Sequence, residues 1–237
     1  MLKVTAFSSS AIVQLDEAPL ALPADSDAEV DRLWQAAQLR AGGTLFNGRM
    51  FSATEVTPDR VRGRLAEYRC WLAQRARPAL FARLQVRPVA VSGLLECADG
   101  ILFGRRAGSL TQDAERWELC PSGALEVGEV RAGAEVDYRA QVLTELREEI
   151  GIGADQVTAI TPFCLVHDAH SHVWDIGIAL STALTTEEIL SLHRTTASDE
   201  YSELRVVPRA TLAAFVAHQG TDLVAVSAAL IARLAFI

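Results

Sequence analysis

The sequence predicts an α/β fold in which a mixed β-sheet lies between two layers of helices, an α/β/α sandwich, preceded by a small α/β unit. Two observations predict it. Short apolar segments bounded by turn residues are typical of β-strands, and they alternate along the chain with segments whose apolar residues recur every three or four positions, as in helices. Such alternation favours a sheet with helices on both faces. The 237 residues are enough for one large domain or two small ones with a substantial core.

The first part of the chain, up to about residue 82, is predicted to be a small α/β unit. Its predicted elements are two strands, a helix, an extended segment and a last segment that is helical at least in its second half: residues 2–7, 11–15, 25–40, 44–56 and 58–76. The pair Asn47-Gly48 predicts a turn within the extended segment. Prolines and arginines in 74–88 mark a boundary. We therefore expect an N-terminal extension, residues 1–82, and a second domain, residues 83–237.

The second domain is predicted to contain two hairpins, a long helix, a further strand and two C-terminal helices. The hairpins and the further strand are predicted at 89–97 with 101–105, at 157–166 with 173–180, and at 202–207. Asp99-Gly100 supplies the turn of the first hairpin. The long helix is predicted at 137–150, between the two hairpins.

The composition excludes several classes of function. The net charge is −8, so no sequence-wide basic character favours a nucleic acid or an anionic membrane as a partner. Lys3 is the only lysine, which leaves none for a phosphate-binding P-loop. The four cysteines form no C-x-x-C pair, so we expect buried thiols rather than a zinc or redox motif. Because neither a signal peptide nor a membrane-spanning apolar run is found, we expect a cytoplasmic protein.

The predicted helix at 137–150 carries a cluster of carboxylates. Glu145, Glu148 and Glu149 lie three and four residues apart, so they share one face of the helix. Three like charges on one face repel each other, and a hard divalent cation such as Mg²⁺ would remove that repulsion. The alternative is a solvated surface with no ligand. Gly151 is expected to end the helix.

The residues before this helix complete a longer pattern. Gly123 and Glu129 are separated by five residues, and residues 145–152 read ELREEIGI. Together they resemble the signature of the Nudix hydrolases, G-x5-E-x7-R-E-U-x-E-E-x-G-U, in which U is aliphatic. The segment 117–129, WELCPSGALEVGE, resembles the strand and glycine-rich turn that open this signature. The resemblance implies the Nudix fold for the second domain, again an α/β/α sandwich with a mixed sheet.

The chain departs from the signature in two ways. Fourteen residues, 130–143, separate Glu129 from Thr144, whereas the family pattern has seven. Thr144 also stands where the family has an arginine that supports the first glutamate of the signature. Arg139 and Arg147 are the candidates to replace it. Loss of such a supporting group weakens metal binding or activity rather than the fold.

The resemblance implies a metal site and its ligands. Carried over position by position, Glu145, Glu148, Glu149 and the backbone carbonyl of Ser122 would bind Mg²⁺ or Mn²⁺, and Glu129 would orient this cluster. In the family the ions bridge the diphosphate of the substrate and bind the attacking water.

A proton acceptor is needed for that water. One of the signature glutamates or a glutamate further along the chain would serve, and the candidates downstream are Glu200 and Glu203. For these two, a solvated surface position is the alternative.

Arginines near the end of the first hairpin are candidates to bind phosphate. Arg105 and Arg106 are adjacent in a strand, so their side chains point to opposite faces and at most one of them can face the substrate. Three histidines, at 167, 170 and 172, invite a metal interpretation, but an exposed hairpin turn is the more economical one.

A further resemblance concerns the substrate. The segment 45–51, LFNGRMF, followed by an expected helix at 64–68, RLAEY, resembles the N-terminal extension of Nudix enzymes that cleave UDP-glucose and UDP-galactose to UMP and hexose 1-phosphate. It implies a nucleotide sugar as the small-molecule substrate, with Phe46 or Phe51 against the base and Asn47 also at the substrate. Two alternative functions remain open: a pyrophosphatase for ADP-ribose, dinucleotides or coenzyme A, and a Nudix module that senses a nucleotide without turnover. The resemblance also leaves a homodimer open as the assembly.

Overall fold

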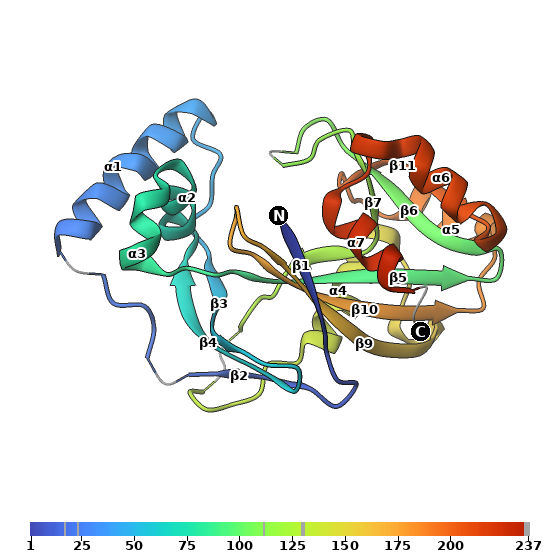
Figure 1. Ribbon diagram of the computed structural model, residues 1–237. Helices are drawn as coiled ribbons and strands as arrows, with labels where there is room; N and C mark the ends of the chain where they lie inside the picture. Colours follow the sequence, from blue (N-terminus) through green and yellow to red (C-terminus); the bar gives the residue numbers. More distant parts are fainter. Residues whose placement is uncertain (17, 23, 111, 129–130, 235–237) are drawn as a thin grey trace.

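The computed structural model describes residues 1–16, 18–22, 24–110, 112–128 and 131–234 (Figure 1). Its large sheet contains eight strands: β1 (Leu2–Ala6), β5 (Val89–Cys97), β6 (Gly100–Arg106), β7 (Trp117–Leu119), β8 (Ser122–Ala124), β9 (Val157–Asp168), β10 (Trp174–Thr182) and β11 (Tyr201–Val207). The main path runs β1-β9-β10-β5-β6-β11, and the short β7 and β8 pair with β6 and β5. β10 and β5 are parallel and the other pairs are antiparallel. The predicted mixed sheet is therefore confirmed.

Helices cover both faces of this sheet. One face packs against α6 (Leu212–Gln219) and α7 (Ala225–Leu234), through a core that joins Phe103 and Val166 of the sheet to Leu230 of α7. The other face packs against α4 (Tyr138–Ile150) and α5 (Thr186–Thr195). Figure 1 shows α6 and α7 in front of the sheet and α4 behind it. The predicted α/β/α sandwich is confirmed.

Helix α4 is built as its sequence predicts. The Asp137 side chain accepts hydrogen bonds from the backbone N–H groups of Arg139 and Ala140, which caps the first turn. Gly151 ends the helix at a φ of 88°, a left-handed conformation that glycine adopts without strain. Leu146 and Ile150 are fully buried against the sheet, so the opposite face of the helix is turned away from this core.

The N-terminal part forms a second, smaller layer structure. Its three-stranded sheet has the order β2-β4-β3, from β2 (Ile12–Leu15), β3 (Arg49–Val56) and β4 (Arg60–Glu67). Its helices are α1 (Ala24–Arg40), α2 (Tyr68–Ala76) and α3 (Phe81–Leu84), and a core that includes Val30, Cys70 and Leu84 holds them together. Along the whole described chain, short 3-10 helices lie at Pro78–Leu80, Ala154–Gln156, Arg209–Thr211 and Gly220–Asp222.

Two local predictions in this part are wrong. The segment 64–68, expected to be a helix, lies in strand β4 except for Tyr68, whereas the predicted helical second half of 58–76 is confirmed as α2. Residues of β4 alternate between the two faces of the sheet, and Gly63 lets the ring of Phe51 approach the backbone. Asn47-Gly48 makes no hairpin turn. The Asn47 side chain instead donates to Glu67 at 3.0 Å and accepts from the backbone N–H of Arg69 at 2.9 Å.

The first fifteen residues contribute one strand to each sheet, β1 to the large sheet and β2 to the small one. β1 pairs with β9 over its whole length, so residues 2–6 complete the large sheet although they precede the N-terminal helices. The Tyr138 hydroxyl of α4 donates to the carbonyl of Ala11 at 2.9 Å, just before β2. A division into two domains near residue 82 stays a prediction, since β1 precedes that position and pairs with β9, which follows it.

Two other expectations concern the cysteines and the membrane. All four cysteines are free and buried, as predicted for thiols that serve as core residues. Within the described ranges, no helix is long and apolar enough to cross a bilayer.

Candidate active site

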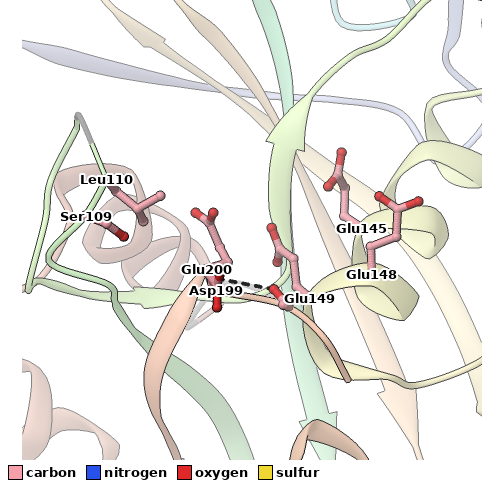
Figure 2. A pocket seen from close by; sticks show the side chains of 8 residues that line it. Ser109, Leu110, Glu145, Glu148, Glu149, Asp199 and Glu200 are labelled. Carbon is pink, nitrogen blue, oxygen red and sulfur yellow. Dashed lines mark hydrogen bonds between the residues drawn. The ribbon is translucent and has the colours of Figure 1, made fainter. Parts of the chain in front are cut away.

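Four of the predicted glutamates line one small cavity. It measures about 330 Å³, and α4 contributes Glu145, Glu148 and Glu149 while the segment before β11 contributes Glu200. Figure 2 shows Glu145 and Glu148 extending from α4, with Glu149 between them and Glu200 in this view. Residues far apart in the sequence are thus brought together around one space.

A second, larger cavity of about 600 Å³ shares Glu145, Glu149 and Glu200 as wall residues. Its opposite wall comes from the N-terminal part of the chain: Met50, Tyr68, Trp71 and Arg75. We call this space the cleft. The aromatic side chains of α2 therefore face the same space as two of the α4 carboxylates.

Glu149 is the most deeply placed of the three. It is 6% exposed, accepts a hydrogen bond from the backbone N–H of Ser122 at 3.2 Å, and lies 3.0 Å from the Tyr201 hydroxyl. Burial, followed by the charges of Glu145 and Glu118, raises its pKa well above the ordinary value.

Glu145 lies against the turn that opens the signature. A Cβ at Gly123 would collide with its carboxylate, so glycine is required for this close approach. Gln141 donates to Glu145 at 2.7 Å. Burial and, to a smaller extent, the charge of Glu148 raise the pKa of Glu145 to about 7 despite this hydrogen bond.

A buried ion-pair network borders these carboxylates, and its central residue, Glu118, was not predicted. Arg106 lies 2.5 Å from Glu118 and 3.0 Å from Glu200. Tyr201 and Ser122 also reach Glu118, at 3.1 and 3.3 Å. Burial raises the pKa of Glu118 even though Arg106 opposes that shift. The sequence signal was a lone acid between the apolar residues of a strand, Trp117 and Leu119, which calls for a buried partner.

The two adjacent arginines behave differently, as the strand geometry predicts. Arg106 faces the cleft, whereas Arg105 is exposed and donates to the carbonyl of Glu115 at 3.1 Å. Arg106 is held by two carboxylates, so its charge is already shared within the protein.

The donor chemistry around the cavity fits a divalent cation. Carboxylate oxygens are the ligands that Mg²⁺ and Mn²⁺ prefer. In the described part of the chain, no salt bridge reaches Glu145, Glu148 or Glu149, and burial, together with the charges of neighbouring glutamates, raises the pKa values of Glu145 and Glu149. In the described ranges, however, no group of three or more His, Cys, Asp or Glu side chains lies close enough together to hold a metal ion.

Other predicted residues lie elsewhere. Phe46 is 85% exposed and Phe51 is fully buried in the core, so neither ring lines the two cavities, and Asn47 is tied to Glu67 and Arg69. Glu203 is bridged to Arg205 at the surface. Glu129 lies outside the described residues.

The histidines of the β9–β10 turn do not gather around a metal. His167 stacks on Trp174 and His172 on Phe81, with ring centroids 4.3 and 3.6 Å apart. His170 lines the cleft. These contacts agree with a hairpin that packs against the N-terminal helices.

Thr144 occupies the position at which the family signature has an arginine. Thr144 is exposed and its hydroxyl donates to the carbonyl of Ala140 at 3.1 Å within α4. Arg139 is engaged elsewhere, since it donates to the Ser9 carbonyl and lies over the Tyr138 ring. Arg147 is exposed.

Comparisons with known proteins give structural likenesses only. No family model matches the chain, and no curated protein matches it. A solved protein of Deinococcus radiodurans is 18% identical, with a TM-score of 0.47 over 72% of this chain and 90% of that one. A bifunctional NMN adenylyltransferase/ADP ribose pyrophosphatase of Francisella tularensis, complexed with AMP and a manganese ion, is 19% identical, with a TM-score of 0.45 over 68% of this chain and 44% of that one.

A third solved structure is the Nudix domain of NrtR from Shewanella oneidensis, complexed with ADP ribose. It is 16% identical, with a TM-score of 0.39 over 58% of this chain and 86% of that one. At such identities, statements about activity rest on the residues of this chain.

Proposed function

We propose that this protein is a Nudix-type pyrophosphatase, a metal-dependent enzyme that hydrolyses the diphosphate of a nucleoside diphosphate linked to another group. The observation that carries the proposal is the placement of the signature. Glu145, Glu148 and Glu149 line one cavity with Glu200, and Gly123 leaves room for the Glu145 carboxylate. A solvated surface would not require burial of Glu149 or a glycine opposite Glu145.

The residues would divide the chemistry as follows. Glu145, Glu148, Glu149 and the Ser122 carbonyl would hold one or more Mg²⁺ or Mn²⁺ ions, which supply positive charge to the diphosphate and lower the pKa of the attacking water. Glu200 would accept the proton of that water, because it lies on the opposite side of the same cavity and its ion pair with Arg106 at 3.0 Å holds the side chain there.

The network behind the ligands holds them in place. Arg106 balances Glu118 and Glu200, and Tyr201 connects Glu118 to Glu149. This arrangement keeps Glu149 directed at the cavity, where no salt bridge from the described residues reaches its carboxylate.

For the substrate we propose a UDP-hexose, UDP-glucose or UDP-galactose, cleaved to UMP and hexose 1-phosphate. Support comes from the N-terminal part of the chain, which forms the far wall of the cleft. Tyr68 and Trp71 both line the cleft and would serve the role that was expected of Phe46 and Phe51. An aromatic wall suits a nucleobase, because stacking on a flat ring excludes water from both surfaces.

The test is a hydrolysis screen in Mg²⁺ or Mn²⁺ with products identified by mass. The substrates are UDP-hexoses, ADP-ribose, a dinucleotide, coenzyme A and a nucleoside triphosphate, and Glu149→Gln is the inactive control. UMP and hexose 1-phosphate as the fastest products support the proposal in full. Faster cleavage of ADP-ribose or a dinucleotide overturns the substrate and keeps the reaction. Nucleotide binding without turnover of any substrate supports the sensor instead.

A further inference from the structure

A buried acid outside the carboxylate cluster also faces the cleft. Asp175, on β10, is 8% exposed and lines the cleft together with Ser92 on β5. The Ser92 hydroxyl donates to Oδ1 of Asp175 at 3.2 Å. Among the described residues no hydrogen bond or salt bridge reaches Oδ2. Asp175 lines the cleft, and Oδ2 is not one of the described side-chain atoms that are both fully buried and unpartnered, so this oxygen is left to accept a hydrogen bond from a group in the cleft.

The position of Asp175 relative to the proposed metal ligands follows from the sheet. Ser122 of β8 lies opposite Ser92 of β5, and β10 is the next strand beyond β5. Asp175 pairs with Ala90, two residues along β5 from Ser92. Adjacent strands lie about 4.8 Å apart and each residue rises about 3.3 Å, so Asp175 lies roughly 12 Å from Ser122, across and along the sheet. A group bound at Asp175 is therefore separated from a diphosphate held at Ser122 and Glu149 by about the length of one sugar.

The chemistry of the pair selects the kind of group. A phosphate is not favoured, because Asp175 and the nearby Glu118 are both acids and the basic residue beside Glu118, Arg106, is already paired with Glu118 and Glu200. A metal ion is not favoured either, since Asp168, the next acid, uses its oxygens on Ser171 and His170. A hydrogen-bond donor such as a sugar hydroxyl fits, and Ser92 holds the acid in the orientation that receives it.

We propose that Asp175, oriented by Ser92, recognises a hydroxyl of a sugar attached to the diphosphate. This inference rests on the proposed function and extends it by naming a residue that determines specificity. The sugar can be the ribose of the nucleotide or the hexose beyond the diphosphate. A site built to bind a hydroxyl rejects an analogue that lacks it, because the buried acceptor is then left unpaired.

The experiment pairs Asp175→Asn with deoxy substrates. The Asn variant should lower kcat/KM for the best natural substrate by about 10- to 100-fold, as expected for loss of a hydrogen bond to a charged group. Ser92→Ala should lower it by about 2- to 10-fold. Asp155→Asn, the same change at an exposed surface position, should have no effect.

The decisive measurement is the coupling between variant and analogue. If Asp175 binds one particular hydroxyl, the defect of Asp175→Asn disappears on the analogue that lacks that hydroxyl and persists on all others. Ribose and hexose deoxy analogues tell the two sugars apart. Equal losses on every analogue, or wild-type kcat/KM in Asp175→Asn, would overturn the inference.

A binding readout separates the inference from the proposed function. The affinity of Glu149→Gln for each nucleotide sugar, with and without Asp175→Asn, is measured by calorimetry. Binding that does not depend on any hydroxyl overturns the role of Asp175 and leaves the pyrophosphatase standing. Wild-type protein that neither binds nor cleaves any nucleoside diphosphate overturns the proposed function and this inference with it. If Asp175→Asn does not fold, the same affinities are measured with Ser92→Ala in its place.

Discussion

The hydroxyl of Tyr201 lies 3.0 Å from Oε2 of Glu149 and 3.1 Å from Oε1 of Glu118. A phenol carries one hydrogen, so it can donate to only one of these buried carboxylates at a time. Gly104 makes the arrangement possible, because a Cβ there would collide with the Tyr201 ring. The residue thus links the proposed metal ligands to the Arg106 ion pairs.

Tyr201→Phe tests this link. Removing the hydroxyl leaves Glu118 and Glu149 with one partner fewer each, and the free energy of unfolding should fall by about 1–3 kcal/mol. Affinity for Mn²⁺ should weaken as well, because Glu149 is no longer directed. Chemical denaturation and a metal titration measure the two effects. Unchanged values for both would show that the hydroxyl has no positioning role.

Glu148→Gln and Glu149→Gln should each lower kcat by at least about 10²-fold, because an amide cannot supply the anionic ligand. Without metal, Glu149→Gln should be at least as stable as the wild type at pH 8, since a buried charge is gone. Glu187→Gln, an exposed change on α5, is the matched control. Near-wild-type turnover in both site variants would refute the proposed ligands.

Gly123→Ala should displace the Glu145 carboxylate, because the new Cβ would occupy its place. The neighbour that must move is the end of a flexible side chain, so we expect little loss of stability but weaker Mn²⁺ binding and lower kcat. Gly128→Ala is the control, since nothing lies within 4 Å of a Cβ at that position. Equal effects of the two alanines on metal affinity would argue against a special role for Gly123.

The pH dependence of stability follows from Asp175 and Glu145, whose pKa values are raised to about 7 by burial. The folded state holds these protons more tightly than the unfolded state, where the values are about 3.8 and 4.5. Their contribution to stability is complete at low pH and is lost as pH rises through about 7. In EDTA, Asp175→Asn should therefore raise the Tm at pH 8, and the gain should shrink towards pH 5. A gain that grows as pH falls would contradict the sign.

Thr144→Arg tests the departure from the family signature. Thr144 is exposed, so a longer side chain has room at the surface of α4. If the missing arginine weakens support for Glu129, the variant should show equal or higher kcat and tighter metal binding. A strongly destabilised or inactive protein would show that the extra residues before α4 already occupy that space.

Local patterns predict much of the scaffold. The ranges of α4, β5 and β9 follow from apolar periodicity, a capping aspartate and a terminal glycine, all of which act within a few residues. Helix α5 was missed although Thr185 and Glu188 form a capping box at its start. The segment 64–68, most of which belongs to strand β4, was mistaken for a helix, because a short apolar run is compatible with both periodicities and only pairing with β3 decides it.

By itself the sequence determined the chemistry of α4, because residues three and four apart on a helix share a face whatever surrounds them: Glu145, Glu148 and Glu149 were found in this way. Tertiary structure alone decided which residues face those carboxylates. Glu118 and Asp175 line the cleft from β7 and β10, and Tyr201 of β11 contacts Glu118 and Glu149, because long-range pairing brings these strands into one sheet. Long-range strand pairing sets such distances, and no local pattern encodes it.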